Sequence, residues 1–211
     1  MKLILVRHGE SVGNFENRLQ GQEDYDLTEL GRRQAELTAL RLREEGTRVV
    51  YTSPLLRAAS TAVAIGEVLD CAPVLLPDVA EYSFGELSGM TYREVREHFA
   101  ATPETANLPA TEREYPGEEG RLNFFQRVTE AIWQVVEKHQ GETVAVISHG
   151  GPIALFCQSV LGLPYKRPMP FAIENCSLAI IEAPDAGGTR DAAVLVRLND
   201  TCHLAEATSN E

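Results

Sequence analysis

The sequence predicts an α/β fold, a three-layer α/β/α sandwich in which helices cover both faces of a mostly parallel sheet. Short apolar runs bounded by polar residues recur along the chain, as is typical of buried strands. Segments with helix-forming residues separate these runs, and strands that alternate with helices favour parallel pairing. The chain has 211 residues, 44% of them hydrophobic, which is enough for one well-packed core.

The first strand and helix have clear boundaries. Lys2–Val6 is an apolar run that we expect to form a buried strand. Thr28 is of a type that caps helix N-termini, and the helix formers of Glu29–Glu45 follow it. Gly46 then provides a C-terminal stop, because glycine readily adopts the left-handed conformation found after helices.

The same alternation continues after Gly46. Arg48–Thr52 is predicted to be the second strand. Ser53 and Pro54 are expected to act as N-cap and first-turn residue of a helix that reaches Leu69. A third strand is predicted at Pro73–Leu76.

The second half of the chain carries further helices and strands around an irregular region. We predict one domain over 1–211, with an inserted surface excursion at about 90–120, because no repeat or linker is visible. The expected helices are Met90–Ala100, Leu122–His139 and Pro152–Leu161, and the expected strands are Thr143–Ser148, Ser177–Glu182 and Ala192–Leu198.

Composition excludes several classes of function. The formal net charge is -12, which opposes broad binding to nucleic acid or to an anionic membrane surface. The apolar runs are far shorter than a membrane-spanning helix needs, and no signal peptide is expected in Met1–Val6. We therefore expect a cytoplasmic protein in which any anionic substrate meets a local cluster of positive charge.

Cysteine placement predicts neither a metal site nor a redox pair. The four cysteines, Cys71, Cys157, Cys176 and Cys202, lie far apart and form no CxxC motif. We expect them to be buried free thiols in a reducing compartment.

Polar groups follow three of the predicted strands. They are Arg7–Gly9, Ser53–Arg57 and Ser148–Gly151. In open α/β sheets, ligands bind beyond the carboxyl ends of the strands. We therefore expect these three segments to meet at one site.

The residue types in these segments suit an anion. The guanidinium forks of Arg7 and Arg57 match the geometry of phosphate oxygens. Gly150 and Gly151 allow close backbone approach, and Pro152 in the first turn of a helix would leave free N–H groups aimed at the same anion. The segments together predict a phosphate site.

Histidines and carboxylates supply the remaining chemistry. A neutral imidazole with one nitrogen fixed and the other free is a nucleophile towards phosphorus, and His8 beside an arginine suits that role. His149 could donate to the phosphoryl oxygens. Glu81 is the best placed of three nearby acids to protonate the leaving group and later activate water, with Asp78 and Glu86 as the other candidates.

The ordered motifs resemble the histidine phosphatase superfamily, in its phosphoglycerate-mutase-like branch. The likeness runs in order from Leu3 to about Ser177. The motifs that carry it are Leu5–Ser11 with Asn14, Gln20–Gly21, Ser53–Leu55 with Arg57, Glu81 with Phe84–Glu86, Ser148–Gly151, and Asn175–Ser177.

The resemblance implies a role for each matching residue and no metal or organic cofactor. His8 would be phosphorylated and Glu81 would donate the proton. The phosphate ligands would be Arg7, Asn14, Arg57, His149 and Gly150, and the substrate contacts would be Gln20, Gly21, Phe84, Arg113 and His203.

Within the superfamily the sequence favours a phosphatase of small phosphorylated metabolites. The mutases carry an Arg-Arg pair and a proline-rich run in the insertion, where this chain has only Arg113 between two glutamates. The segment 198–204 resembles that of metal-independent phosphoserine phosphatases, although Phe84 replaces their substrate-side histidine and Glu119 replaces a serine or threonine.

Two alternatives remain at this point. The first is a 2,3-bisphosphoglycerate-dependent phosphoglycerate mutase. The second is a non-catalytic phospho-ligand-binding module, although such a module would be expected to lack His8 or Glu81, and both are present. A homodimer is compatible with the family resemblance.

Overall fold

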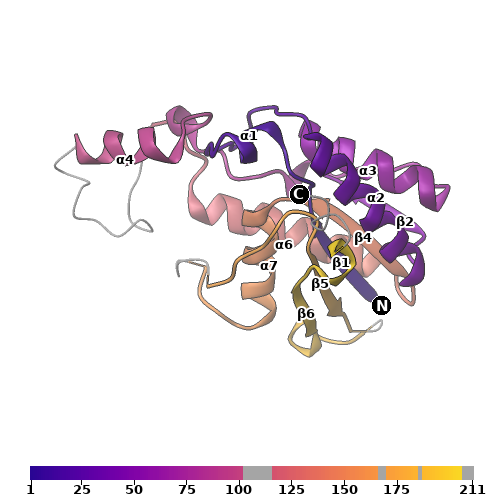
Figure 1. The fold of residues 1–211 in the computed structure, drawn as a ribbon. Helices are drawn as coiled ribbons and strands as arrows, with labels where there is room; N and C mark the ends of the chain where they lie inside the picture. The colour runs from indigo at the N-terminus through magenta and orange to yellow at the C-terminus, as the bar shows by residue number, and fades with distance from the viewer. Residues whose placement is uncertain (102–115, 166–169, 185–186, 206–211) are drawn as a thin grey trace.

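Six strands of the described residues form one sheet in the computed structural model, which describes residues 1–101, 116–165, 170–184 and 187–205 (Figure 1). The strand order is β3-β2-β4-β1-β5-β6, in which β5 pairs antiparallel with both β1 and β6 and the other pairs are parallel. The predicted fold class is therefore confirmed. The strands are β1 Lys2–Arg7, β2 Val49–Thr52, β3 Val74–Leu75, β4 Thr143–Ser148, β5 Leu178–Glu182 and β6 Val194–Asp200.

The helices cover both faces of this sheet. In Figure 1, α2 and α3 lie on one side of the strands, and α6 and α7 lie on the other. The described helices are α1 Val12–Phe15, α2 Glu29–Glu44, α3 Leu56–Leu69, α4 Tyr92–Ala100, α6 Arg121–Lys138 and α7 Gly150–Val160. Five of them agree with the predicted helices to within a few residues, whereas the short α1 was not predicted.

Alternating side chains of β1 explain why helices can pack on both faces. Leu3 and Leu5 lie in the core cluster formed with α6 and α7, whereas Ile4 and Val6 lie in the cluster formed with α2 and α3. Successive side chains of a strand point to opposite faces, so a continuous apolar run marks a strand that is buried on both. All four side chains have no exposed surface.

The N-terminal boundary of α2 was predicted correctly, and that of α3 was not. The Thr28 hydroxyl accepts a hydrogen bond from the Gly31 N–H at 3.1 Å and caps α2. The prediction that Ser53 caps α3 is wrong, because α3 begins at Leu56 after Leu55, which makes no side-chain cap. The Ser53 hydroxyl instead lies 2.8 Å from His149 Nε2.

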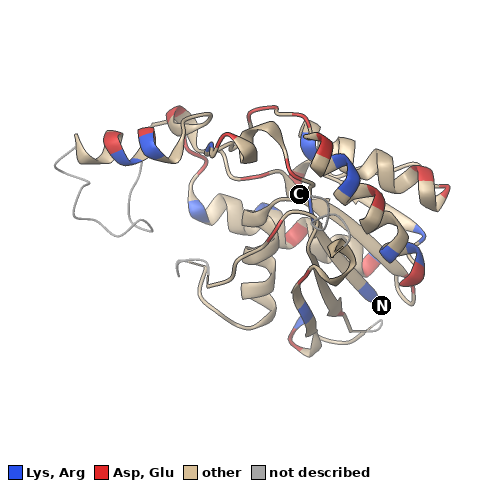
Figure 2. Cartoon of the chain, in the orientation of Figure 1, with Lys and Arg blue, Asp and Glu red and all other residues tan. Residues whose placement is uncertain are grey.

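Several other expectations concern the surface. Residues 102–115 of the predicted excursion lie outside the described residues. Acidic and basic side chains are interspersed along α2 and α4 (Figure 2). No helix in the described ranges has the length and apolar character needed to cross a membrane.

The cysteines are free, as predicted, but they are not all buried. Cys157 and Cys176 are buried and Cys71 is partly buried, whereas Cys202 is exposed. Cys202 lies in a short 3₁₀ turn after the edge strand β6.

A close backbone contact holds the loop after β1 against the start of α2. A Cβ atom on Gly9 would lie 2.4 Å from the Gly31 oxygen, and one on Gly31 would lie 2.0 Å from the Glu10 oxygen. Side chains cannot occupy such distances, so glycine is required at both positions. The contact fixes where the residues after β1 leave the sheet.

We predict that Gly31→Ala destabilises the protein by about 1–3 kcal/mol, because the new methyl group would overlap the loop backbone. Alanine is the better helix former by about 1 kcal/mol, so a net loss would show that the overlap dominates. Urea unfolding measures the difference, with Glu36→Ala on the exposed face of α2 as the control. A Gly31→Ala protein as stable as the parent would contradict the close contact.

Candidate active site

Strand register brings the polar segments together at one edge of the sheet. Arg7 of β1 pairs with Ser148 of β4, so the next residues, His8 and His149, emerge side by side. Their ring centroids are 5.1 Å apart. On the other side of β4, the last residue of β2, Thr52, pairs with Ile147, and Ser53 follows it.

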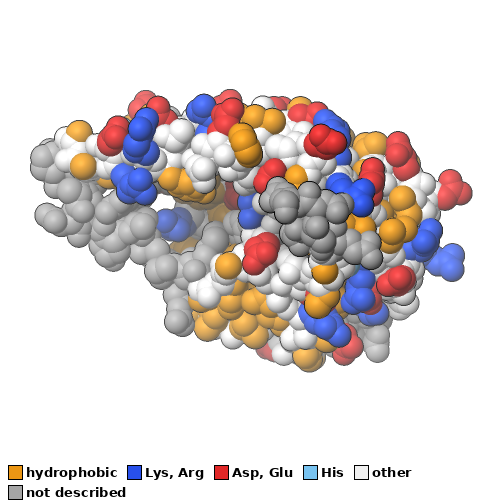
Figure 3. All heavy atoms as spheres, viewed as in Figure 1, with side chains coloured by type: hydrophobic (Ala, Val, Ile, Leu, Met, Phe, Trp, Pro, Cys, Tyr) orange, Lys and Arg blue, Asp and Glu red, His pale blue; other side chains and the backbone are white. Residues whose placement is uncertain are grey.

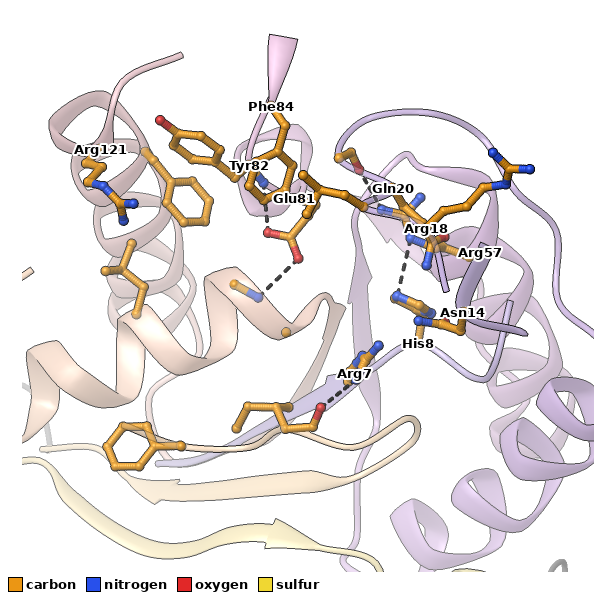
Figure 4. A pocket seen from close by; sticks show the side chains of 18 of the residues that line it. Arg7, His8, Asn14, Arg18, Gln20, Arg57, Glu81, Tyr82, Phe84 and Arg121 are labelled. Atoms are coloured by element: carbon orange, nitrogen blue, oxygen red, sulfur yellow. Dashed lines mark hydrogen bonds between the residues drawn. The ribbon is translucent and has the colours of Figure 1, made fainter. Parts of the chain in front are cut away.

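These segments line a cavity of about 340 Å³ that lies beyond the strand ends. Figure 3 shows the molecule hollowed beneath α4, with basic and hydrophobic side chains inside the hollow. Most of the predicted site residues face this cavity (Figure 4): Arg7, His8, Asn14, Gln20, Gly21, Arg57, Glu81, Phe84 and Gly150.

Two of the remaining predicted residues do not line the cavity wall, and a third lies outside the described residues. His149 is fully buried beside His8. Arg113 lies outside the described residues. The predicted substrate contact of His203 is corrected, because its Nε2 lies 3.0 Å from the Thr38 hydroxyl on α2, away from the cavity.

Hydrogen bonds define the state of the His8 ring. Its Nδ1 lies 2.7 Å from the Gly9 carbonyl oxygen, which can only accept, so Nδ1 carries the proton. Nε2 accepts a hydrogen bond from Arg57 Nε at 3.2 Å. Burial lowers the pKa of His8 well below its ordinary value, and the charges of Arg7 and Arg57 lower it further. The ring is therefore neutral, with the Nε2 lone pair on the arginine side.

His149 is held through one of its two ring nitrogens. Its Nε2 lies 2.8 Å from Ser53 Oγ, and its buried Nδ1 has no hydrogen-bond partner among the described residues. Burial lowers its pKa well below the ordinary value, with Arg57 as the next cause. A buried polar nitrogen without a partner is costly, so this site suits a ligand oxygen.

Two arginines make the cavity locally positive. Arg57 is 1% exposed and donates to the carbonyl oxygens of Gly21 and Glu23 at 2.7 and 2.8 Å. Burial lowers its pKa to about 10, so it remains charged near neutral pH. Arg7 donates to the Ile173 carbonyl oxygen at 2.6 Å.

Glu81 reaches the cavity from the loop after β3 (Figure 4). Its Oε1 accepts from the Tyr82 N–H at 2.8 Å and its Oε2 from the Gly151 N–H at 3.1 Å. The first turn of α7 therefore binds this carboxylate through Gly151, which corrects the expectation that the Gly151 N–H is free for the anion. A Cβ atom on Gly151 would lie 2.1 Å from Glu81 Oε1, so the approach requires glycine.

Arg127 of α6 holds the loop that carries Glu81, and sequence reasoning missed it. It makes two 2.7 Å hydrogen bonds to the carboxylate of Glu119 and donates to the carbonyl oxygens of Asp78, Ala80 and Glu81. The available signal was its position next to buried residues of an amphipathic helix, because a charge there needs a partner. Glu119 had been noted only as a departure from the family pattern.

Asn175 is a second residue without a predicted role. Its Nδ2 donates to the His8 carbonyl oxygen at 2.9 Å and to Asn14 Oδ1 at 3.2 Å. It therefore joins the residue after β1 to the first turn of α1. Its motif was visible in the sequence, but nothing local indicated a contact 167 residues away.

The fold and the site define an α/β protein with a desolvated, positively charged centre that suits a phosphate group. The chain belongs to the histidine phosphatase superfamily (branch 1), whose sequence model matches residues 3–201. Family membership was expected from the motifs and is confirmed.

Individual relatives cover nearly the whole chain. It is 35% identical to phosphoserine phosphatase 1 of Hydrogenobacter thermophilus, over 98% of this chain and 95% of that protein. It is 30% identical to a probable phosphoglycerate mutase, GpmB, of Yersinia enterocolitica, over 97% and 95% respectively. Among solved structures, Bacillus stearothermophilus YhfR is 28% identical with a TM-score of 0.84, covering 96% of this chain and 98% of that one.

We predict that His8 and His149 stay neutral at pH 6.5, the ordinary pKa of histidine, because both folded-state pKa values are lowered. The unfolded chain then binds more protons, so the free energy of unfolding should fall as the pH decreases through 6.5. NMR of the ring nitrogens, in native and urea-unfolded protein, measures the protonation. Two imidazolium signals from these rings in the native protein at that pH would contradict the prediction.

Proposed function

We propose that this protein hydrolyses small phosphomonoesters in two steps, through a phosphohistidine at His8 Nε2. The observation that carries the proposal is a buried, neutral His8 whose Nε2 lone pair lies beside a charged Arg57, in the cavity that Glu81 also faces. A neutral imidazole with its other nitrogen fixed is a competent nucleophile. The phosphate group would replace the Arg57 to His8 hydrogen bond with contacts of its own.

In the first step, His8 Nε2 forms a bond to phosphorus and the bond to the ester oxygen breaks. Arg7 and Arg57 stabilise the charge on the phosphoryl oxygens, and His149 Nδ1 donates to one of them. Glu81, when protonated, transfers its proton to the departing alkoxide. The products of this step are the alcohol and phosphorylated His8.

In the second step, water attacks the phosphohistidine and Glu81 accepts the proton that water loses. The bond between phosphorus and Nε2 breaks, which returns His8 to its neutral form and releases inorganic phosphate. One carboxylate thus serves as acid and then as base. The hydrogen bonds from Tyr82 and Gly151 keep it in one place through both steps.

The proposal assigns no step to a metal ion or an organic cofactor. Two guanidinium groups and the His149 imidazole supply the positive field. The substrate is proposed to be a small phosphorylated metabolite in the cytoplasm, with no role for nucleic acid or membranes, because the net charge of -12 repels polyanions. A homodimer remains part of the proposal on family resemblance.

A phosphoglycerate mutase is the second candidate, because a probable mutase is among the relatives. A panel of phosphorylated metabolites, assayed for phosphate release in EDTA with and without 2,3-bisphosphoglycerate, distinguishes the two. We expect release in EDTA without the bisphosphate. Dependence on the bisphosphate would favour the mutase, and binding without turnover would favour a phospho-ligand-binding module.

We predict that His8→Ala lowers turnover by about 10⁴-fold or more, because no neighbouring group can replace the nucleophile. Substrate labelled with ³²P and quenched during turnover should leave acid-labile label on the parent protein and none on the variant. His98→Ala on α4 is the matched control, since that residue does not line the cavity. Label on Ser11, or a fully active His8→Ala protein, would overturn the mechanism.

We predict that Glu81→Gln slows hydrolysis of an alkyl phosphate by roughly 10²- to 10⁴-fold, since glutamine keeps the size but lacks the transferable proton. With p-nitrophenyl phosphate the first step should be affected much less, because nitrophenolate leaves without protonation. Stopped-flow measurements should show a burst of nitrophenol followed by slow turnover. Equal losses in the first step for both esters would show that Glu81 is not the acid.

A further inference from the structure

One wall of the cavity is formed mainly by aromatic and aliphatic side chains, with Arg121 beside them (Figure 4). The Tyr82 ring centroid lies 5.0 Å from that of Phe84 and 5.1 Å from that of Phe124, both in edge-to-face contact. Leu155, Tyr165 and Phe171 also line the cavity.

The polar atoms of this wall are already engaged. The Tyr82 hydroxyl donates to Glu118 Oε2 at 2.5 Å, so the residue is left to present its ring to the cavity. Phe84 is fixed through its backbone, which bridges to Glu118. Its ring packs beside Gly21, where an added Cβ would lie 3.2 Å from the Phe84 Cδ2 atom. This surface therefore offers apolar contacts to a ligand.

The charges around the cavity select against a cation. Four arginines line it, namely Arg7, Arg18, Arg57 and Arg121. Within the described part of the lining, Glu81 is the one carboxylate, and the proposed mechanism uses it as acid and base. An ammonium group on the substrate would thus lose its hydration beside four arginines, with no other carboxylate in the described lining to pair with it.

We propose that the preferred substrates are phosphomonoesters whose alcohol has an apolar or aromatic body and carries no ammonium group. This inference rests on the proposed phosphatase function and names the substrate class of the same site. The phosphate would lie between Arg7 and Arg57, and the alcohol would lie along Phe84, Tyr82 and Phe124. The apolar body would be stabilised by burial and the aromatic one also by ring contacts.

Three primary alkyl phosphates test the proposal while keeping the leaving groups similar. Propyl phosphate and phosphoethanolamine have nearly the same size, and differ by a methyl in place of an ammonium group. The third ester, 3-phenylpropyl phosphate, adds a phenyl ring to the first. We expect kcat/KM to rise about 10- to 100-fold from propyl to 3-phenylpropyl phosphate, and to fall about tenfold or more for phosphoethanolamine.

Variants of Phe84 show whether the wall causes this preference. We expect Phe84→Ala to reduce the ratio of kcat/KM for 3-phenylpropyl over propyl phosphate by about five- to tenfold, and Phe84→Leu to reduce it less, because leucine keeps an apolar contact. Phe15→Ala is the matched control, since Phe15 is 74% exposed and does not line the cavity. That control should leave the ratio unchanged.

The outcomes separate this inference from the proposed function. Faster hydrolysis of phosphoethanolamine or phosphoserine than of 3-phenylpropyl phosphate would overturn the substrate class and leave the phosphatase standing. An unchanged ratio in both Phe84 variants would overturn the assignment of the wall. Absence of phosphate release from every ester would overturn the proposed function, and the substrate class with it.

Discussion

Two guanidinium groups buried beside two imidazoles are the constraint on which the rest of the site depends. Removing Arg7 and Arg57 from water is costly, and backbone carbonyl oxygens of Gly21 and Ile173 offset part of that cost. Burial, together with these positive charges, lowers the pKa of the neighbouring His8 and keeps its ring unprotonated. A phosphate dianion relieves the repulsion between the arginines, so substrate binding and the activation of the nucleophile draw on the same electrostatic field.

The proposed acid is positioned by different means. Glu81 lies on a loop, and two elements fix it: the first turn of α7 binds the carboxylate, and Arg127 of α6 binds the backbone. Arg127 is itself held by two hydrogen bonds to Glu119. A carboxylate that gives a proton and later takes one must stay in a constant position. Here a helix side chain, Arg127, holds the loop that carries the carboxylate.

Sequence reasoning succeeded where the signal was local. The continuous apolar run of β1 and the cap at Thr28 depend on neighbouring residues, and the placement of His8 follows from the rule for strand ends. It failed where partners come from distant segments. Ser53 resembles a helix cap but contacts His149, and His203 lies in a family-like motif but contacts α2. Only the folded arrangement decides between two hydrogen-bond partners that are equally plausible locally.

The contact between Gly151 and Glu81 has an evolutionary consequence. A single added methyl group at this glycine would occupy the place of the carboxylate. One substitution at a residue that takes no part in bond making would therefore displace the Glu81 carboxylate. Homologues that carry a side chain at this position must hold the matching carboxylate in a different place.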